Sequence, residues 1–447
     1  MKSILAIFTC FILQLSYAQG PAITSWLQNS TIKGSHYVNG NSTAIADTAL
    51  ANIRTVSYSS NWVYIKTNGV PTYTTGPFLD GNPSLTTAQN AIFKISLNPV
   101  KNTGTPSPTT GGNIGQFING VALFDYRDGV SWSNTANALK GGPLGGMGDN
   151  IWNRDAVVAE KKGFDCSKGH PAMGNYHHHQ NPSAFKLDRQ VISSICNLYD
   201  ADGLYAIDTT KHSPLIGFAA DGFPIYGAYA YRNTNGTGAI TRMKSAYHLR
   251  AISVRNQYAN GSNVTAGPAV NSTYPLGYFR EDYEFVQDTA QDVLDVSNGR
   301  FCITPEYPNG IYCYFATVDA NWNSAYPYVV GPNFYGVKNA AKVNSITEPV
   351  TQYKPTTQVQ ALSDNAFECL LFPNPANHTL AIQYKGLLSS DLTLQLMDLQ
   401  GQLLQIKLLK QGSTIVYFDV ETLYAGNYIV LIQSEQQQIA KRISIQH

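Results

Sequence analysis

Histidines carry most of the chemistry that this chain could perform. Five of its nine histidines fall between His170 and His212, and three of these are consecutive, at positions 177 to 179. Imidazole is the commonest metal ligand among side chains, and it also exchanges protons near neutral pH. We therefore expect any functional site to be built around residues 166–179.

Strand alternation divides the histidine run into two kinds of position. A β-strand over Tyr176–Gln180 would project His177 and His179 from one face, about 6 to 7 Å apart. Tyr176 and His178 would then lie on the opposite face. Two histidines at this spacing can bind one metal ion, so we predict that His177 and His179 are ligands of a transition metal.

A third ligand has two candidates. His170 lies between Gly169 and Pro171, in a turn that could fold back on the strand, and His212 lies two residues before Pro214. Zinc(II) and copper(II) both suit sites rich in imidazole. The sequence alone does not choose between the two histidines or between the two metals.

Acidic residues near these histidines could support the site. A carboxylate that bonds the outer nitrogen of a ligating histidine fixes its tautomer, and Asp155, Glu160, Asp165 and Asp221 are the candidates. A metal-dependent hydrolase also needs a base beside an open metal position, for which we choose Glu160. Asp221 is a second catalytic candidate because Gly222 places it on a turn that could aim it into a cleft.

Other functions remain open. The histidines could form a hydrogen-bonded structural cluster, or they could perform acid–base chemistry without a metal. The chain has 28 tyrosines and 5 tryptophans, and a cluster such as 226–231 could stack on glycans, although alternating aromatic residues are also typical of cross-strand pairs. The main hypothesis is a metal-binding protein that could be a metal-dependent enzyme. The alternative is a surface protein that is structural or binds a glycan or another small molecule.

The elements that position these residues are predicted to be mostly β-strands. Short alternating or β-branched runs, such as Trp62–Ile65 and Ala91–Leu97, are separated by turn residues. Helical patterns are few and short, and they lie near 133–139, 151–160 and 184–199. The sequence therefore predicts a mainly β fold with a few short helices.

Two cysteine pairs are predicted to form disulfides. Cys302 and Cys313 flank a turn, and a hairpin centred between Tyr307 and Pro308 would place them directly opposite one another. Cys166 and Cys196 pair by elimination, which leaves Cys369 as a single thiol. Cys166 could instead be a metal thiolate.

Composition and the first residues indicate the compartment. The net charge is +1 and only 13% of residues are charged, so nothing favours binding to nucleic acid or to an anionic membrane. Residues 1–18 combine an early lysine, an apolar run and a small-residue ending, which is typical of a cleaved secretory signal peptide. No other stretch reaches the roughly 20 apolar residues of a membrane span. We therefore expect an exported protein.

The chain is long enough for more than one domain. We expect a large β-rich domain over residues 19–337, a linker of low apolar content over 338–369, and a small immunoglobulin-like β-sandwich over 370–447.

Four motifs follow one another near the C-terminus: Phe372–Ala376, Asp398–Gly401, Leu423–Tyr428 and Lys441–Ser444. With these motifs in this order, the C-terminal part resembles the type A sorting domain of the type IX secretion system of Bacteroidetes. The resemblance implies that this machinery is a partner and that the protein passes through the periplasm to the cell surface or the medium.

The large domain contains a series of motifs: Trp152–Glu160, Gly163–Cys166, Gly169–Pro171, Tyr176–His179, His212–Gly217, Asp221–Gly227 and Thr304–Gly310. Through these motifs it resembles the YHYH family of secreted bacterial proteins. His178 stands where the family motif has its second tyrosine, and the related segment 312–315 has no histidine. The resemblance supplies site positions but no activity.

Overall fold

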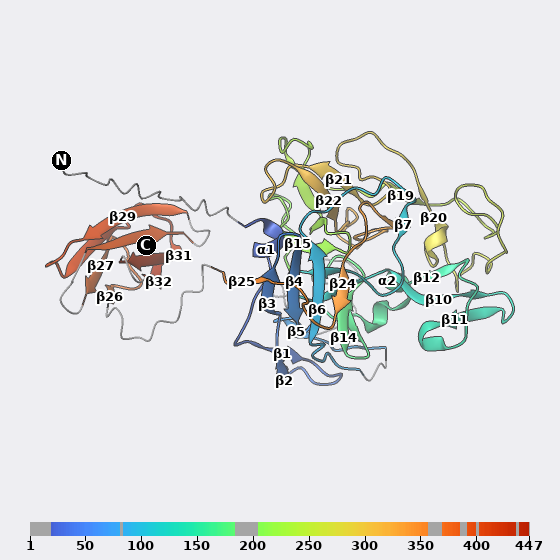
Figure 1. Cartoon of the computed structure of the whole chain (residues 1–447), viewed down its shortest axis with the longest axis horizontal. Helices are drawn as coiled ribbons and strands as arrows, with labels where there is room; N and C mark the ends of the chain where they lie inside the picture. The colour runs from blue at the N-terminus through green and yellow to red at the C-terminus, as the bar shows by residue number, and fades with distance from the viewer. Residues whose placement is uncertain are drawn as a thin grey trace, which may run out of the picture. The chain divides into compact units, whose positions relative to one another are not determined.

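A computed structural model describes residues 19–80, 84–183, 204–355, 369–384, 391–398, 402–434 and 438–446. The chain divides into two compact units, one ending at Tyr353 and one beginning at Lys354 (Figure 1). Both are built mainly of β-strands, and the described α-helices are the short α1 (Pro21–Thr24) and α2 (Ala156–Ala159). The prediction of a mainly β protein with few helices is confirmed. The expected signal peptide lies outside the described residues.

The largest sheet of the first unit has eight strands and carries the histidine run. Its order is β13 (Gly169–Ala172), β14 (Asn175–His178), β9 (Ala122–Phe124), β8 (Asn113–Phe117), β15 (Leu215–Ala219), β16 (Pro224–Tyr226), β22 (Ile311–Phe315) and β21 (Gly299–Cys302). The chain enters this sheet from segments more than 150 residues apart, so residues distant in sequence become neighbours on one surface.

A five-stranded sheet packs against the eight-stranded one. Its order is β24 (Ala341–Val343), β6 (Ala91–Ser96), β4 (Trp62–Thr67), β3 (Ile53–Tyr58) and β25 (Thr351–Tyr353). One buried apolar cluster joins the two sheets: it includes Val56, Val63 and Ile95 from the smaller sheet, and Leu215 and Phe218 from the larger. Burial of this shared apolar surface is the main force that holds the two sheets together.

Strands β24 and β25 change the expected domain boundary. They lie within the predicted linker 338–369, but β24 pairs with β6 and β25 pairs with β3. The segment up to Tyr353 therefore belongs to the large unit. Low apolar content concealed these strands because both are short edge strands that are mostly exposed.

Smaller strand groups complete the first unit. They are β1 (Lys33–His36), β2 (Ile45–Leu50) and β5 (Thr74–Thr75); β10 (Arg127–Ser133), β11 (Ala138–Gly141) and β12 (Asn153–Asp155); β17 (Tyr229–Tyr231) with β18 (Ile240–Arg242); β19 (Tyr247–Leu249) with β20 (Tyr283–Phe285); and β7 (Ser107–Pro108) with β23 (Asn333–Phe334). Among the described residues of this unit, the 3-10 helices are η1 (Gly142–Leu144), η2 (Lys161–Gly163) and η4 (Arg280–Asp282).

Two of the predicted helices are corrected. Within 133–139, residues 134–137 form the turn between β10 and β11 and the rest belong to these two strands, since the small polar residues there favour a turn. Within 151–160 only α2 is helical, because β12 occupies the residues before it. The third prediction, 184–199, falls outside the described residues.

The predicted Cys302–Cys313 disulfide is wrong in this structure, where both residues are free. Strand pairing sets Cys302 opposite Ile311 and Cys313 opposite Arg300, so the cysteines are diagonal neighbours instead of a facing pair. A hydrogen bond with Cys313 lowers the pKa of the Cys302 thiol. The register differs because the turn closes through bonds between Thr304 and Tyr307, which move the hairpin centre by one position.

The second cysteine pair is not resolved by the described residues. Cys166 is buried and is not among the free cysteines. Its expected partner, Cys196, lies outside the described residues, so the pairing stays a prediction. Cys369 is free, as expected.

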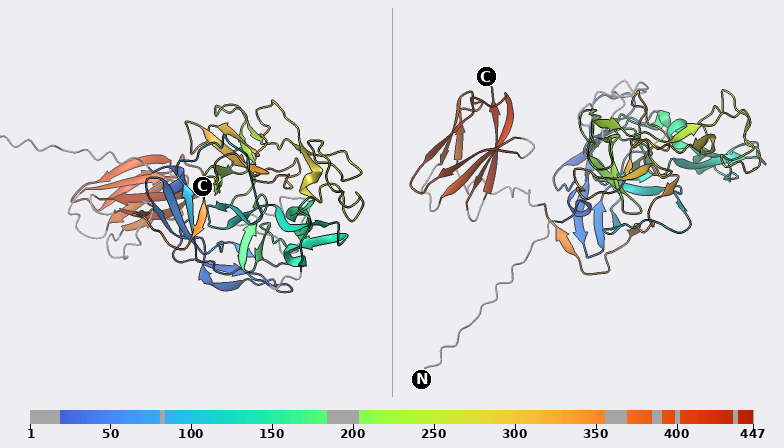
Figure 2. Two further views of the ribbon diagram at one scale, coloured as in Figure 1. Left: turned by 45° about the vertical axis from the view of Figure 1, so that its right-hand side comes forward. Right: turned by 90° about the horizontal axis from the view of Figure 1, so that it is seen from above.

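The described residues of the second unit form two facing sheets (Figure 2). One contains β26 (Cys369–Phe372), β27 (Thr379–Tyr384) and β30 (Ile415–Asp419), and the other contains β29 (Leu403–Leu409), β28 (Leu392–Met397), β31 (Gly426–Gln433) and β32 (Gln438–Ile445). Leu392, Leu394 and Leu396 alternate inward along β28 and enter an apolar core shared by both sheets. This is the arrangement of the expected immunoglobulin-like sandwich.

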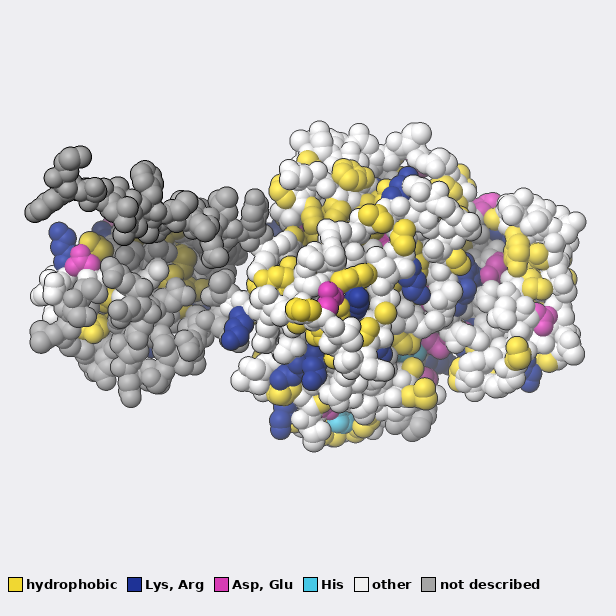
Figure 3. Space-filling model, in the orientation of Figure 1, with side chains coloured by type: hydrophobic (Ala, Val, Ile, Leu, Met, Phe, Trp, Pro, Cys, Tyr) yellow, Lys and Arg dark blue, Asp and Glu magenta, His cyan; other side chains and the backbone are white. Residues whose placement is uncertain are grey.

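The visible surface offers no single-sign charged patch. On the face drawn in Figure 3, Lys and Arg side chains lie singly or in small groups among polar and apolar atoms. None of the helices in the described residues is long and apolar enough to cross a membrane.

Candidate metal centre

A tight hairpin positions two of the histidines. Strands β13 and β14 pair antiparallel, with His170 directly opposite His177. The connecting residues Met173 and Gly174 both have positive φ, 48° and 84°, which is the conformation of a two-residue hairpin turn. A Cβ on Gly174 would lie 2.1 Å from the Thr87 hydroxyl oxygen, so the turn needs glycine there. The hairpin thereby fixes His170 and His177 on one face of the sheet.

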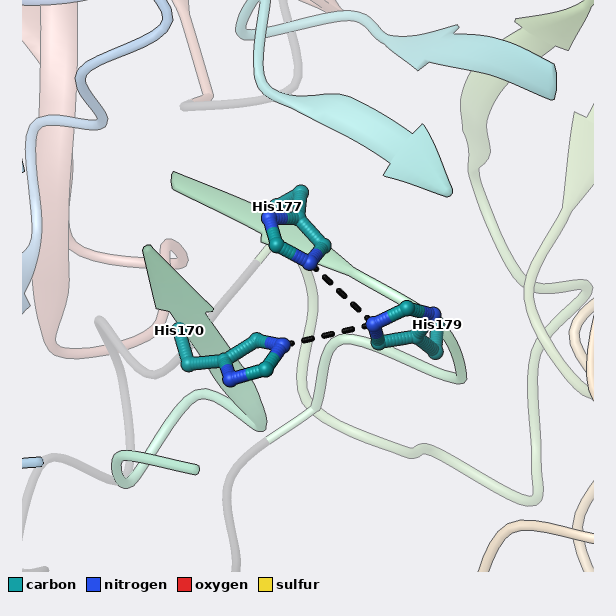
Figure 4. A group of neighbouring side chains, drawn as sticks. All are labelled: His170, His177 and His179. Carbon is teal, nitrogen blue, oxygen red and sulfur yellow. Dashed lines mark hydrogen bonds between the residues drawn. The ribbon is translucent and has the colours of Figure 1, made fainter. Parts of the chain in front are cut away.

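Three imidazole rings converge on that face (Figure 4). His177 Nε2 lies 3.1 Å from His179 Nε2, and His170 Nε2 lies 3.3 Å from the same atom. One ring nitrogen from each histidine can be chosen so that all three lie within 4.8 Å of one another, and this buried group could hold a metal ion. His170 therefore supplies the third ring that the sequence left open between two residues.

The outer nitrogens of two rings have fixed partners. His177 Nδ1 lies 2.9 Å from the Asn175 carbonyl oxygen, and His179 Nδ1 lies 2.7 Å from the Asp125 carbonyl oxygen. A carbonyl only accepts hydrogen bonds, so each Nδ1 must carry the proton and donate it. In the neutral ring the proton-free atom is then Nε2. Both lone pairs are directed into the centre.

Burial keeps the rings neutral. His170, His177 and His179 are only 7%, 2% and 4% exposed. Burial lowers the pKa of His179 to about 4, and it holds the pKa values of His170 and His177 well below their usual range. At neutral pH the centre thus contains uncharged imidazoles, the form that binds metals.

Glu160 completes the group. Its Oε2 lies 3.4 Å from His170 Nε2 and 3.5 Å from His179 Nε2. The residue follows α2 directly and begins η2, and the Asp155 side chain caps α2 by accepting a bond from Val157 N. Burial raises the pKa of Glu160 to about 8. The predicted catalytic carboxylate therefore faces the centre at the distance of a fourth donor.

Two phenylalanine rings pack against the histidines of the centre. Phe124 of β9 stacks on His177 with ring centroids 4.0 Å apart, and Phe164 meets His170 edge-on at 4.9 Å. These rings limit imidazole rotation and keep water from the nitrogens. Nothing in the sequence pointed to Phe124 or to the Asp125 carbonyl, since both reach the histidines only because β9 pairs with β14.

The opposite face of β14 contains a hydrogen-bond network of tyrosine, aspartate and histidine side chains. Tyr176 donates to Asp165, at 2.8 Å and 3.0 Å to its two oxygens, and the Tyr73 hydroxyl lies 2.9 Å from His178 Nε2. Asp165 also accepts bonds from the backbone N–H groups of residues 76, 167 and 169. Asp165, which we considered as a partner of a metal-binding histidine, instead holds Tyr176.

Two predicted residues lie outside the centre. His212 Nδ1 bonds the Ser213 carbonyl oxygen, and its ring packs against Tyr226 and Tyr231. Asp221 is fully buried and accepts bonds from Tyr314 and from the backbone of Gly336 and Phe223. Among the described residues, neither one contacts the converging histidines. Asp221 is thus occupied in holding neighbouring backbone segments.

The C-terminal unit matches a known address for export. Residues 370–446 match the secretion system C-terminal sorting domain. The protein is therefore exported to the cell surface or the medium, and its C-terminal unit is the part that engages the type IX secretion machinery. No curated protein matches the chain.

The large unit matches a family model over most of its length. Residues 92–327 match the model described as YHYH protein, and this span is more than half of the 447-residue chain. It contains the hairpin, the three converging histidines and Glu160. The chain belongs to the YHYH protein family.

Proposed function

We propose that this exported protein binds one transition-metal ion, zinc(II) or copper(II), at the Nε2 atoms of His170, His177 and His179. The observation that carries the proposal is the approach of two lone pairs. Nε2 of His177 and Nε2 of His179 are 3.1 Å apart, while both Nδ1 atoms donate to carbonyl oxygens. Two buried acceptors at this distance repel one another unless a cation lies between them.

The distances suit a single ion. Ligand atoms bound tetrahedrally at about 2.0 to 2.1 Å are about 3.3 to 3.4 Å apart. The nitrogens of His170 and His177 lie 3.3 Å and 3.1 Å from that of His179, and Glu160 Oε2 lies 3.4 Å and 3.5 Å from two of them. We therefore assign Glu160 as the fourth donor.

A purely hydrogen-bonded cluster accounts less well for the contacts. To satisfy the contact between Nε2 of His177 and Nε2 of His179, one of these two atoms would need a proton, and that neutral ring would then have to give up its bond from Nδ1 to a carbonyl. A doubly protonated ring would place a charge among apolar side chains, which burial opposes. A metal ion satisfies the lone pairs without either cost.

Elemental analysis of the full chain, purified without a histidine tag, tests the proposal. We expect about one equivalent of zinc or copper, and we expect H177A combined with H179A to lose it. H212A is the matched control, because this half-buried histidine lies apart from the centre. Copper(II) would be identified by its electron paramagnetic resonance spectrum, which zinc(II) lacks.

Two results would overturn the proposal. One is a wild-type protein that contains no metal and whose melting temperature does not respond to added zinc or copper. The other is metal content that survives the double substitution. Retention on glycan arrays that is insensitive to the double substitution would favour a surface-binding function instead.

Metal-dependent hydrolysis is a second candidate function. Three histidines can hold a catalytic metal and leave a fourth position open. The Glu160 side chain is 19% exposed, against 9% for His170 and 3% for His179, so it is the member of the group nearest to solvent. In this alternative Glu160 is the base. Hydrolysis of a model ester by the wild type, abolished in E160Q with the metal retained, would favour it.

A further inference from the structure

A cavity of about 230 Å³ lies between the two main sheets of the large unit. Its walls come from β4 and β6 of the five-stranded sheet and from β8, β9 and β15 of the eight-stranded sheet, and β24 lies at its edge. Strands β4, β6 and β24 can be followed side by side in Figure 1. Small residues keep this space open where larger ones would fill it: Ala91, Gly115, Ala122, Ala219, Ala340 and Ala341.

Most of the wall is apolar, and its mouth is exposed. Phe93, Phe124 and Phe218 contribute aromatic surface. Ala341 and Lys342 of β24 also line the cavity, and both are exposed to solvent. A benzene molecule occupies an apolar protein cavity of roughly 150 Å³. The cavity thus has room for one aromatic ring that carries a substituent.

One buried polar side chain in the wall lacks a partner. Gln116 of β8 is 2% exposed, and neither its Nε2 nor its Oε1 has a hydrogen-bond partner among the described residues. It is paired in the sheet with Ala122 and Phe218, which also line the cavity. Buried amide groups normally have partners, so an unpaired one at a cavity wall indicates a ligand group.

The neighbouring polar side chains make their hydrogen bonds to other groups. The Thr67 hydroxyl bonds the backbone of Gly120 and Gly69, and the Asn113 oxygen accepts from Gly115 N. The Gln89 amide donates to the Thr87 carbonyl. These groups are engaged locally, and Gln116 is left with both a donor and an acceptor to offer.

We propose that this cavity binds a small, neutral, mainly aromatic molecule that carries an amide group, with the amide paired to Gln116. An amide presents one acceptor to Nε2 and one donor to Oε1, so it satisfies both atoms. A carboxylate would satisfy Nε2 but would set a negative charge against Oε1. The amide is therefore the better complement.

The cavity adjoins the histidine centre through one ring. Phe124 lines the cavity and stacks on His177, and Asn175, which also lines it, accepts the bond from His177 Nδ1. A bound ring would therefore touch the residues that orient His177. The binding itself requires no metal, so it stands apart from the proposed metal site.

Benzamide is the probe that tests the proposal. We expect the full chain, in the presence of a chelator, to bind benzamide saturably by titration calorimetry, and to bind it more tightly than benzoate. Q116M, which keeps the side-chain size, should weaken benzamide binding about tenfold or more, the loss expected for hydrogen bonds in a buried site. Toluene, which makes no hydrogen bonds, should bind wild type and Q116M alike.

A variant at the mouth keeps the test decisive if Q116M folds poorly. Ala341 is exposed, so A341F should leave the fold unchanged and should block both benzamide and toluene. Absence of benzamide binding to the wild type would show a cavity that holds only water and would overturn the proposal. Equal affinity of Q116M for benzamide, or tighter binding of benzoate than benzamide, would also overturn it.

Discussion

The two faces of β14 use the same residue type in different ways. On one face His177 meets His170 and His179 through Nε2 atoms that are all turned inward. On the other face His178 Nε2 meets the Tyr73 hydroxyl, which can donate to it, and Tyr176 donates to Asp165. Both faces are almost fully buried. On the face of His178 the imidazole Nε2 meets a hydroxyl donor, whereas on the face of His177 lone pairs meet lone pairs.

This contrast separates a structural histidine from a ligand histidine. Burial alone does not distinguish them, because His178 is as buried as its neighbours. The partner of each nitrogen does distinguish them: a hydroxyl can satisfy an imidazole lone pair, but another imidazole lone pair cannot. The face of His178 should therefore govern the stability of the fold, and the face of His177 should govern its response to metal.

The largest expected effect falls on the structural face. D165A should lower the free energy of unfolding by about 4 kcal/mol or more, since each buried donor left without an acceptor costs about 1–3 kcal/mol. Asp165 accepts from four such groups, at Gly76, Ser167, Gly169 and Tyr176. Urea denaturation followed by circular dichroism measures the change.

The control for this substitution is D165N, which keeps one acceptor oxygen and should lose less stability than D165A. The unfolding free energy that D165A loses should be the same with and without added metal. A D165A protein that unfolds like the wild type would show that the network on this face does not support the fold.

The next effect separates the two faces directly. A ligand present at about 100 times its dissociation constant stabilises the folded state by about 2.7 kcal/mol. Added zinc or copper should therefore raise the unfolding free energy of the wild type and of H178Q by a similar amount. H177A should lose this gain, because it removes a converging nitrogen. Loss of the gain in H178Q as well would contradict the division of roles.

A smaller effect concerns the loss of folding stability at acidic pH. Burial lowers the pKa of His178 to about 3, against about 6.5 for an unfolded histidine. Between these values the unfolded chain binds more protons than the folded one, so stability falls as pH decreases. His178 alone should contribute a loss of about 1.5 kcal/mol between pH 6.5 and 5.

The difference between wild type and H178Q isolates that contribution. Urea titrations of chelator-treated protein at several pH values should show a shallower pH dependence in H178Q. Identical slopes would mean that His178 is not held neutral by its surroundings.

The smallest effect concerns the fourth donor. E160Q keeps the shape and one acceptor oxygen but removes the charge next to the three histidines. We expect metal affinity to fall about tenfold, or about 1.4 kcal/mol, against complete loss in H177A. Competition with a chromophoric chelator measures both. An unchanged affinity would mean that Glu160 is not a ligand and would favour its role as a base.

Local pattern alone predicted several features correctly. Short strands at the spacing of a sandwich indicated the C-terminal unit, and alternation along 176–179 separated His177 and His179 from Tyr176 and His178. These inferences succeed because side-chain direction in a strand depends on a period of two residues, which is a property of adjacent residues. Turn residues specify the position of a turn less closely than alternation specifies a face. The predicted register of the hairpin between β21 and β22 was wrong for that reason.

The sequence by itself therefore determined the two-unit β architecture, the export address and the pair of histidines at the centre of the site. Only the tertiary structure decided that His170 joins them and His212 does not, and that Glu160 faces the centre while Asp221 braces backbone. The physical reason is that strand pairing between distant segments sets these contacts. His170 is placed by its register with His177, and the Asp125 carbonyl and Phe124 arrive through β9. No local pattern encodes which distant strand becomes the neighbour.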